Sequence, residues 1–323
     1  MKAICAACDD NFVPHFATMM ISTHLATPGS TFFLAPINMS SGNIEQLQSF
    51  ASKMSADLRV LDTGNLDLSR FIVGGIWSSA TWARIFMPQL LPAELDKVLY
   101  LDCDIVVLKD LSRLFELEMG GHAIAATPEP VTEGVLERKR VLGIPDDAAF
   151  FNSGSSLMNL VEWRKRGLGK RIADFALAHP EKLALVDMCA INAILAVEAI
   201  PLGVEYNFQP QIYAMDGFDP AIIHFSAKQK PWKNRVPAGG YLYRHFRNLT
   251  PWPFRWEESR STRIRHSIDH HRKFLRRTLL ALLGMKHHRQ YAKRYLDALH
   301  TDFRLRRMLR EMQQRDKKLM PGS

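Results

Sequence analysis

The stretch KVLYLDCDIVVLKDL (residues 97–111) places two aspartates in the middle of an apolar run. The residues on either side of them have the β-prone composition of a strand that is covered on both faces. Residues i and i+2 of an extended backbone point to the same side, so Asp102 and Asp104 should project together while Cys103 faces away. Two neighbouring half-buried carboxylates repel each other unless a cation lies between them, and Mg²⁺ and Mn²⁺ take oxygen ligands in this way. A DxD sequence alone is weak evidence for a metal site. Its position at the end of a buried apolar run makes the evidence stronger and predicts a divalent metal site here.

The composition is that of an ordinary globular protein. The chain has 323 residues, 47% hydrophobic and 23% charged, which is enough for one large domain or two. Four cysteines do not make a disulfide framework in a chain of this length, which favours a reducing compartment. Cys5 and Cys8 form a CxxC, but positions i and i+3 of a strand face opposite ways, so no metal or redox site is expected there. No run reaches the roughly 18 apolar residues of a membrane span, and the start does not resemble a signal peptide.

The formal net charge of +9 is unevenly distributed along the chain. Residues 255–323 hold 19 Lys+Arg against 7 Asp+Glu, whereas the preceding residues hold 23 against 26. The basic character therefore belongs to the C-terminal part, and the rest is nearly neutral. A nearly neutral body argues against nucleic acid as the main ligand of the folded part, and we expect no nucleic-acid binding.

Strand-like and helix-like segments alternate up to about residue 250. The expected strands are residues 2–8, 31–36, 57–64, 97–104, 123–128, 149–160 and 221–225. The expected helices begin near Asn43, cover residues 77–91, and run through Leu168, Ile172 and Phe175. This alternation predicts an α/β fold with a mostly parallel sheet flanked by helices, in which ligands bind beyond the carboxyl ends of strands. We expect a catalytic domain over residues 1–250 and a basic helical tail over residues 251–323.

Two further segments carry polar residues where a ligand could approach. CDDNF (residues 8–12) directly follows the first expected strand, where a nucleotide-binding α/β fold holds the base and ribose, although Asp and Asn are also ordinary turn residues. FFNSGSSLMNL (residues 150–160) places Asn152, Ser153 and Gly154 inside an apolar strand. Such residues in a strand indicate either a bulge or the close approach of a ligand.

A third segment, HFSAKQKPW (residues 224–232), begins at the end of the apolar run AIIHF. Its first residue, His224, is either a core histidine with a hydrogen-bonded partner or a residue that completes the carboxylate site. Beyond it, Lys228, Lys230 and Lys233 suit the neutralisation of phosphate oxygens and a solvated basic loop equally well.

The segments AACDDNF, LYLDCDIVV, FFNSGSSLMNL, VDMCAIN and HFSAKQKPW, in this order, resemble those of the family 8 retaining glycosyltransferases. The resemblance covers residues 2 to about 235, and the best-known bacterial members are lipopolysaccharide α-galactosyltransferases and α-glucosyltransferases. It implies the nucleotide-diphospho-sugar transferase fold called GT-A. It also implies transfer of galactose or glucose from a UDP-sugar, with retention at the anomeric carbon, to a lipopolysaccharide or another lipid-linked or free glycan. Mn²⁺, or Mg²⁺, is expected to bridge the diphosphate.

The resemblance also assigns site residues by position. The expected metal ligands are Asp102, Asp104 and His224. The expected uridine contacts are Ala7, Asp9 and Asn11. The other residues expected at the donor are Arg84, Cys103, Asn152, Ser153, Asp187 and Lys230. Asp187 and Asn152 are the expected catalytic residues, beside the donor sugar.

Three places depart from the family's pattern. The family's DQD motif reads Asp187-Met188-Cys189 here, so a thioether replaces the glutamine near the anomeric centre. Retention needs either a nucleophile under the sugar or attack from the face of departure, and Met188 favours the second route, a different donor sugar or low activity. Ala227 replaces a glycine, which restricts the loop that closes over the diphosphate. Pro128 and Pro130 occupy the place of a sugar-binding aspartate, so that contact is expected to be missing.

The C-terminal part combines apolar and basic residues at helical spacing. The apolar residues are Phe274, Leu275, Leu279, Leu282 and Leu283, and the basic ones among them are Arg272, Lys273, Arg276 and Arg277. Such a segment suits an anionic membrane surface, and the alternative is a helix packed on the body with a solvated basic face. The pairs His270-His271 and His287-His288 are expected to be solvated. The prediction is a cytoplasmic enzyme held at the inner face of the cell membrane.

Two rival functions remain open on the sequence. The same carboxylates would serve a metal-dependent phosphohydrolase, which would consume a UDP-sugar without an acceptor. A degenerate transferase fold that binds a UDP-sugar without turnover is the other, and Met188 is the best argument for it.

Overall fold

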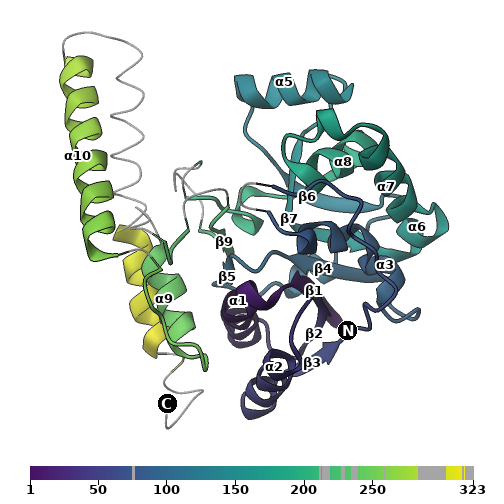
Figure 1. Cartoon of the computed structure of the whole chain (residues 1–323), viewed down its shortest axis with the longest axis horizontal. Helices are drawn as coiled ribbons and strands as arrows, with labels where there is room; N and C mark the ends of the chain where they lie inside the picture. Colours follow the sequence, from purple (N-terminus) through teal and green to yellow (C-terminus); the bar gives the residue numbers. More distant parts are fainter. Residues whose placement is uncertain are drawn as a thin grey trace.

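The structure is a computed structural model that describes residues 1–74, 77–210, 212, 219–226, 230–233, 239–257, 259–282, 303–314 and 316, with not every side chain of 259–282 included. Its centre is a seven-stranded sheet in the order β3-β2-β1-β4-β7-β6-β8 (Figure 1). The strands are β1 (Lys2–Cys8), β2 (Ser30–Pro36), β3 (Asp57–Val60), β4 (Lys97–Leu101), β6 (Ile124–Pro128), β7 (Phe151–Asn159) and β8 (Ile200–Pro201). Strands β3, β2, β1 and β4 are parallel, β7 is antiparallel to β4 and β6, and β8 is parallel to β6. The predicted α/β fold with a mostly parallel sheet is therefore confirmed.

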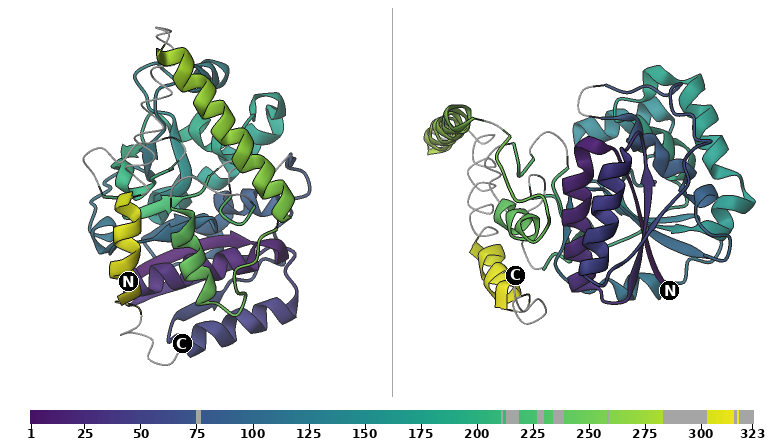
Figure 2. Two further views of the ribbon diagram at one scale, coloured as in Figure 1. Left: turned by 90° about the vertical axis from the view of Figure 1, so that its left-hand side faces the viewer. Right: turned by 60° about the horizontal axis from the view of Figure 1, so that its bottom comes forward.

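Helices cover both faces of the sheet (Figure 2). The helices packed on one face are α1 (Val13–Ala26), α2 (Ser41–Lys53) and α9 (Gly240–Asn248). Those on the other face are α3 (Met87–Leu90), α6 (Leu160–Lys165), α7 (Leu168–Ala178) and α8 (Val186–Leu195). The remaining helices are α4 (Ser112–Phe115), α5 (Glu133–Leu142) and α10 (Arg260–Leu282). Both faces of the central strands are buried because these strands are apolar almost throughout, so successive residues face opposite cores.

Strand β1 shows how the alternation builds two cores. Ile4 and Cys8 lie in the core beneath α1, whereas Ala3 and Cys5 lie in the core on the opposite face. Cys5 and Cys8 therefore face opposite ways, as the spacing predicts. Burial raises the pKa of the Cys5 thiol well above its ordinary value, which makes it an unreactive core residue.

The DxD segment is not part of one continuous strand, and that expectation was wrong. Strand β4 ends at Leu101, a turn holds residues 102–104, and a new strand β5 (Ile105–Val107) begins. Strand β5 leaves the main sheet and pairs with β9 (Ile222–His224) in the antiparallel direction, with Ile105 opposite His224. The turn thus places the histidine beside Asp104, which a straight strand would not do.

The expected helix over residues 77–91 is also different in kind. Residues Ser79–Phe86 form a 3-10 helix, and only Met87–Leu90 continue as α-helix. A 3-10 helix has three residues per turn, so residues three apart lie on one edge. Ser78, Thr81 and Arg84 have this spacing, and all three line the same cavity.

The C-terminal part is not uniform. The helical residues 303–314 pack on the body, because Leu305 is fully buried in the core shared with α9 and Arg304 forms an ion pair with Asp219. By contrast, α10 stands away from the sheet in Figure 1 and in the right-hand view of Figure 2. Among the described residues, no helix is long and apolar enough to cross a membrane. The predicted Leu283, His287 and His288 lie outside the described residues.

Candidate active site

A cavity of about 360 Å³ opens at the carboxyl ends of β1 and β4. Its wall also includes residues of α5, α8, β7 and β9. The carboxyl side chains among the described lining residues are Asp9, Asp102, Asp104, Glu129 and Asp187, and the lysines and arginines are Arg84, Arg138 and Lys230. Acidic groups therefore outnumber basic ones, and an anionic ligand would need an accompanying cation to bind here.

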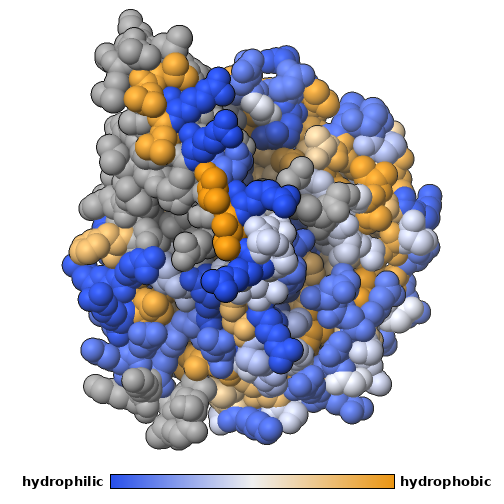
Figure 3. Space-filling model, turned by 60° about the vertical axis from the view of Figure 1, so that its left-hand side comes forward, coloured by the Kyte–Doolittle hydropathy of each residue, from blue (hydrophilic) through white to orange (hydrophobic). Residues whose placement is uncertain are grey.

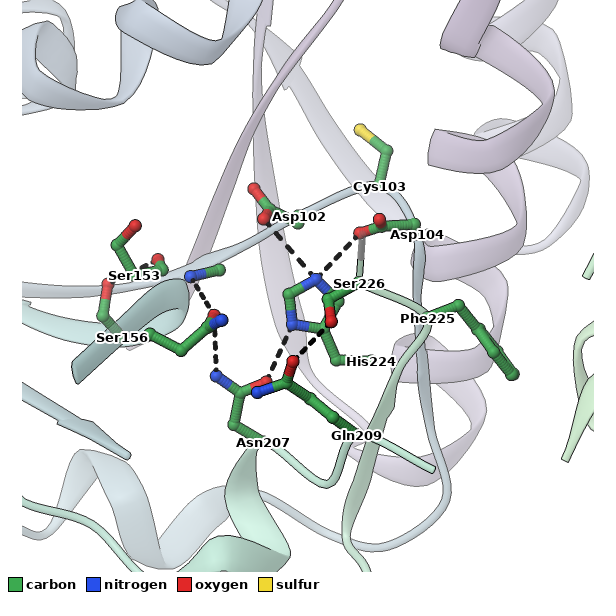
Figure 4. A network of polar contacts seen from close by, with 12 residues as sticks. Asp102, Cys103, Asp104, Ser153, Ser156, Asn207, Gln209, His224, Phe225 and Ser226 are labelled. Carbon is green, nitrogen blue, oxygen red and sulfur yellow. Dashed lines mark hydrogen bonds and ion pairs between the residues drawn. The ribbon is translucent and has the colours of Figure 1, made fainter. Parts of the chain in front are cut away.

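Two aspartates and a histidine converge on one wall of the cavity (Figure 4). Nε2 of His224 lies 3.1 Å from Oδ1 of Asp104 and 3.7 Å from Oδ2 of Asp102. One ligand atom from each residue lies within 4.8 Å of the others. Cys103 points away from this group and its thiol lies 3.4 Å from the carbonyl oxygen of Ala7. The structure thus brings together the three predicted metal ligands, although the turn differs from the expected strand.

Gly154 makes this convergence possible. A Cβ atom at this position would lie 2.4 Å from Cε1 of His224 and 2.5 Å from Oδ2 of Asp102. The Gly154 carbonyl also accepts a 2.8 Å hydrogen bond from the backbone N–H of Asp102. No side chain fits between the two ligands and β7, so the glycine within the FFNSGSSLMNL segment has a specific steric cause.

The residues present fit a divalent cation. Oδ1 of Asp104 is buried and has no hydrogen-bond partner among the described residues, although His224 lies nearby. A buried carboxylate oxygen without a hydrogen bond is costly unless a ligand or ion satisfies it. Two carboxylates and one imidazole form a hard oxygen-rich donor set, which suits Mn²⁺ and, with the nitrogen ligand, less well Mg²⁺.

Lys230 lies next to Asp102, Asp104 and His224, the candidate ligands that are called the metal-ligand cluster below. Its ammonium contacts Oδ2 of Asp104 and donates a 2.8 Å hydrogen bond to the carbonyl of Phe225. Burial favours the neutral carboxyl of Asp104, but the Lys230 ammonium and His224 outweigh burial and hold the pKa of Asp104 well below its usual range. Two residues further, Trp232 stacks on the buried ring of His15 at 3.7 Å between centroids and anchors this segment on α1. Lys233, another predicted cation, is exposed.

Arg84 contacts both the metal-ligand cluster and strand β7. Its Nη2 lies 2.6 Å from Oδ1 of Asp102, and its Nη1 donates a hydrogen bond to the Ser153 hydroxyl. Its guanidinium stacks 4.3 Å over the ring of Tyr100. The pKa of Arg84 is raised, because Asp102 and Asp187 outweigh its burial. A buried guanidinium held by two ion pairs and a hydrogen bond is a rigid part of the site rather than a mobile one.

Asp187 lies in the first turn of α8 and lines the cavity beside Met188. Burial is the main reason that its pKa is raised from 3.8 to about 6, with Arg84 opposing and Asp102 adding to the shift. The preceding residue, Val186, has φ 40°, which is strained for a β-branched side chain. Such strain costs on the order of 1–3 kcal/mol and is typical of functional sites.

Of the three residues predicted to contact uridine, two line the cavity and one does not. Ala7 and Asp9 line the cavity at the end of β1, and Oδ1 of Asp9 accepts a hydrogen bond from the backbone N–H of Phe12. Asn11 is exposed and is not among the lining residues, whereas Phe12 is. Asn152 and Ser153 are buried on β7 at the cavity wall.

Sequence reasoning missed a second layer of polar residues. Glu129 lies between the two prolines that were expected to remove a carboxylate, and its Oε1 accepts hydrogen bonds from Nδ2 of Asn152 at 2.7 Å and Nε2 of Gln209 at 3.0 Å. A carboxylate is therefore present there, while the loss of a sugar contact at the two prolines stays a prediction. Asn207 was also missed, and no local pattern in YNFQP (residues 206–210) marks it. Ala227 and Lys228 lie outside the described residues.

Comparison with known proteins agrees with this geometry. The chain is 26% identical over 274 residues to General stress protein A of Bacillus subtilis (strain 168), covering 77% of this chain and 94% of that protein. It is 28% identical to the lipopolysaccharide 1,2-glucosyltransferase of Escherichia coli (strain K12), covering 55% of this chain and 56% of that one. A crystal structure of the galactosyltransferase LgtC with donor and acceptor sugar analogs superimposes with a TM-score of 0.70 at 22% identity, over 77% of this chain and 96% of that one. The expected GT-A fold is thereby confirmed.

The family assignment follows from the extent of the match. The family model described as "Glycosyl transferase family 8" matches residues 3–235, which include the metal-ligand cluster, Asp187 and Lys230. The protein therefore belongs to glycosyl transferase family 8 and is a glycosyltransferase.

Proposed function

We propose that the protein transfers a hexose, galactose or glucose, from a UDP-sugar to a glycan acceptor with retention of the anomeric configuration and with Mn²⁺ at Asp102, Asp104 and His224. The observation that carries the proposal is the convergence of these three side chains, within 4.8 Å, on a cavity whose acidic groups outnumber its basic ones. A diphosphate is repelled by such a cavity unless a divalent cation bridges it to the carboxylates.

The chain's own residues supply the remaining steps. Bound at the cluster, a divalent cation would neutralise charge that develops on the departing diphosphate. Lys230, already beside Asp104, adds a second positive charge at that place. Asp187 and Asn152 lie further along the wall, where carboxylate and amide groups bind sugar hydroxyls. The thioether of Met188 offers no comparable hydrogen bond, which favours attack on the face from which UDP departs.

The acceptor is proposed to be a lipopolysaccharide or another lipid-linked oligosaccharide at the inner face of the cell membrane. Two relatives, both from Escherichia coli, are lipopolysaccharide 1,2-glucosyltransferases. On α10, Ile264, Ile268, Leu275 and Leu279 are 50–62% exposed beside exposed Arg265, Arg272 and Arg276. Figure 3 shows apolar residues interrupting a hydrophilic surface on this side of the molecule. An apolar stripe flanked by arginines suits the headgroup region of an anionic bilayer.

Calorimetric titration with UDP tests the donor site. Wild-type protein should bind UDP with Mn²⁺ and at least about tenfold more weakly in EDTA, because the diphosphate loses its bridging charge. An Asp102→Ala/Asp104→Ala variant should bind equally weakly with and without Mn²⁺. UDP affinity that is the same in all four titrations would rule out the proposed donor site.

A further inference from the structure

We propose that Asn207 is a positioning residue that fixes Nε2 of His224 as the nitrogen facing Asp102 and Asp104 and links this histidine to Asn152. The role of the nitrogen as a metal ligand rests on the proposed function, whereas the orientation of the ring rests on the hydrogen bonds alone.

Backbone pairing holds Asn207 beside the histidine. It follows a 3-10 turn (Val204–Tyr206), and its neighbour Phe208 forms a bridge with Ile223. Phe208 donates its N–H to the carbonyl of Ile222 at 3.0 Å and accepts from the N–H of His224 at 2.9 Å. These bonds hold the fully buried Asn207 beside His224, the last residue of β9, which also pairs with Ile105 of β5.

The direction of each hydrogen bond follows from one backbone donor. The N–H of Gly154 donates to Oδ1 of Asn152 at 2.9 Å, which identifies that atom as the amide oxygen. The same oxygen lies 3.0 Å from Asn207, which must therefore present its Nδ2 group. The other end of the Asn207 amide, its Oδ1, then faces Nδ1 of His224 at 2.8 Å (Figure 4).

The ring orientation follows from this order. An amide oxygen only accepts hydrogen bonds, so Nδ1 of His224 must carry the proton. In a neutral imidazole the other nitrogen then has a free lone pair. That nitrogen, Nε2, is the one that lies 3.1 Å from Asp104 and 3.7 Å from Asp102. Partners of this kind orient a metal-binding histidine and select its tautomer.

Asn207 also links His224 with two other residues of the cavity. Asn152, which receives its Nδ2 bond, donates its own Nδ2 to Glu129 at 2.7 Å, and both residues line the cavity. Both polar atoms of Asn207 are therefore used, one on the histidine and one on Asn152. A change at Asn207 should disturb the histidine ring and Asn152 together.

The test compares wild type with Asn207→Ala, Asn207→Asp and a control, Asn192→Ala. Asn192 is also fully buried and makes three hydrogen bonds, two of them to the backbone of Phe151, but none to a side chain of the cavity. Asn207→Asp keeps an oxygen that accepts from His224 and loses the donor to Asn152. Two readouts are used: Mn²⁺ affinity by calorimetry, and the ¹⁵N shift of Nδ1 of His224 in the metal-free protein. The His224 signals are assigned by their loss in His224→Gln.

Wild type should show a preference for a protonated Nδ1 at His224. Asn207→Ala should lose this preference and bind Mn²⁺ about 10–100-fold more weakly, the usual effect of removing such a partner. Asn207→Asp should keep both the protonated Nδ1 and the Mn²⁺ affinity of wild type. Asn192→Ala should change only thermal stability. An unprotonated Nδ1 in wild type, or unchanged Mn²⁺ affinity in Asn207→Ala, would overturn the inference. If wild type itself does not bind Mn²⁺, the proposed metal site fails, while the ¹⁵N shifts still decide the role of Asn207.

Discussion

Nε of Arg84 lies 3.3 Å from Oδ2 of Asp187, and both side chains are almost fully buried. Neither of these two atoms makes a hydrogen bond with good geometry to the described residues. The contact is therefore an electrostatic one, without the directional hydrogen bond that would fully satisfy the buried oxygen. It also carries a cost, because burial without full hydrogen bonding disfavours the charged carboxylate.

Replacing Asp187 by asparagine should stabilise the metal-free protein at neutral pH and abolish transfer. The folded-state pKa of Asp187 is raised to about 6 from 3.8, so the free energy of unfolding falls as the pH rises from about 3.8 to about 6 and stays lower above that. The Asp187→Asn variant removes this cost, and one pKa unit corresponds to about 1.4 kcal/mol, so a gain of about 1–3 kcal/mol is expected.

Urea unfolding in EDTA from about pH 4 to 8 checks the sign. The difference between Asp187→Asn and wild type should be largest above pH 6 and shrink as the pH falls toward 4, because the unfolded state of wild type then also begins to hold the proton. A difference that does not depend on pH would show that burial of the charge is not its cause.

A methyl group at Gly154 should destroy the metal-ligand cluster. The added Cβ would lie 2.4 Å from His224 and 2.5 Å from Asp102, so at least one ligand must move. Gly154→Ala should lose Mn²⁺ binding and about 1–3 kcal/mol of stability, the usual cost of overpacking. Gly42→Ala is the matched control, since Gly42 lies in α2 with nothing within 4 Å, and it should be neutral or slightly stabilising. Normal Mn²⁺ affinity in Gly154→Ala would contradict the described packing.

Loss of the Lys230 ammonium should weaken donor binding. Charge-assisted hydrogen bonds contribute about 1.5–3 kcal/mol, so Lys230→Met should bind UDP about 10–100-fold more weakly in the presence of Mn²⁺. Lys233→Met, three residues away at an exposed position, should change the affinity little. Equal effects of the two substitutions in calorimetry would indicate a diffuse basic loop instead of a specific contact.

Introducing acidic residues on the apolar stripe of α10 should release the protein from anionic vesicles. Leu275→Asp/Leu279→Asp removes two exposed apolar contacts and adds repulsion from the lipid headgroups. Val131→Asp/Val197→Asp, which changes two exposed apolar residues of the body, is the control. Co-sedimentation with phosphatidylglycerol vesicles should fall at least about tenfold for the first variant only. Unchanged co-sedimentation would assign membrane contact to another surface.

Local patterns predicted the parts of the fold that depend on local sequence. The apolar run of residues 2–8 became β1 without a change of bounds, because a strand buried on both faces needs little more than continuous apolar residues. The DxD turn was missed because two aspartates between apolar runs do not reveal that the second run pairs with β9. The 3-10 geometry of residues 79–86 was missed because its amphipathic pattern is also that of an α-helix.

The site could be predicted where its residues lie in recognisable motifs, and not where contacts are made across the fold. Asp102, Asp104 and His224 meet as expected, although 120 residues separate the last two. Glu129 and Asn207 have no such motif, since their hydrogen bonds depend on where β6 ends and on the bridge between Phe208 and Ile223. Relationships of this kind exist only once the sheet has formed.

Release of UDP from a panel of UDP-sugars tests the central claim most directly. Each sugar is incubated with Mn²⁺ or EDTA, with wild type or Asp102→Ala/Asp104→Ala, and with or without a lipid-linked oligosaccharide extract. The account predicts turnover of one hexose donor that requires the acceptor, keeps the donor's anomeric configuration in the product and disappears in both controls. Consumption of the donor without acceptor would instead identify a phosphohydrolase, and UDP binding without turnover of any sugar would identify a binding protein with a transferase fold.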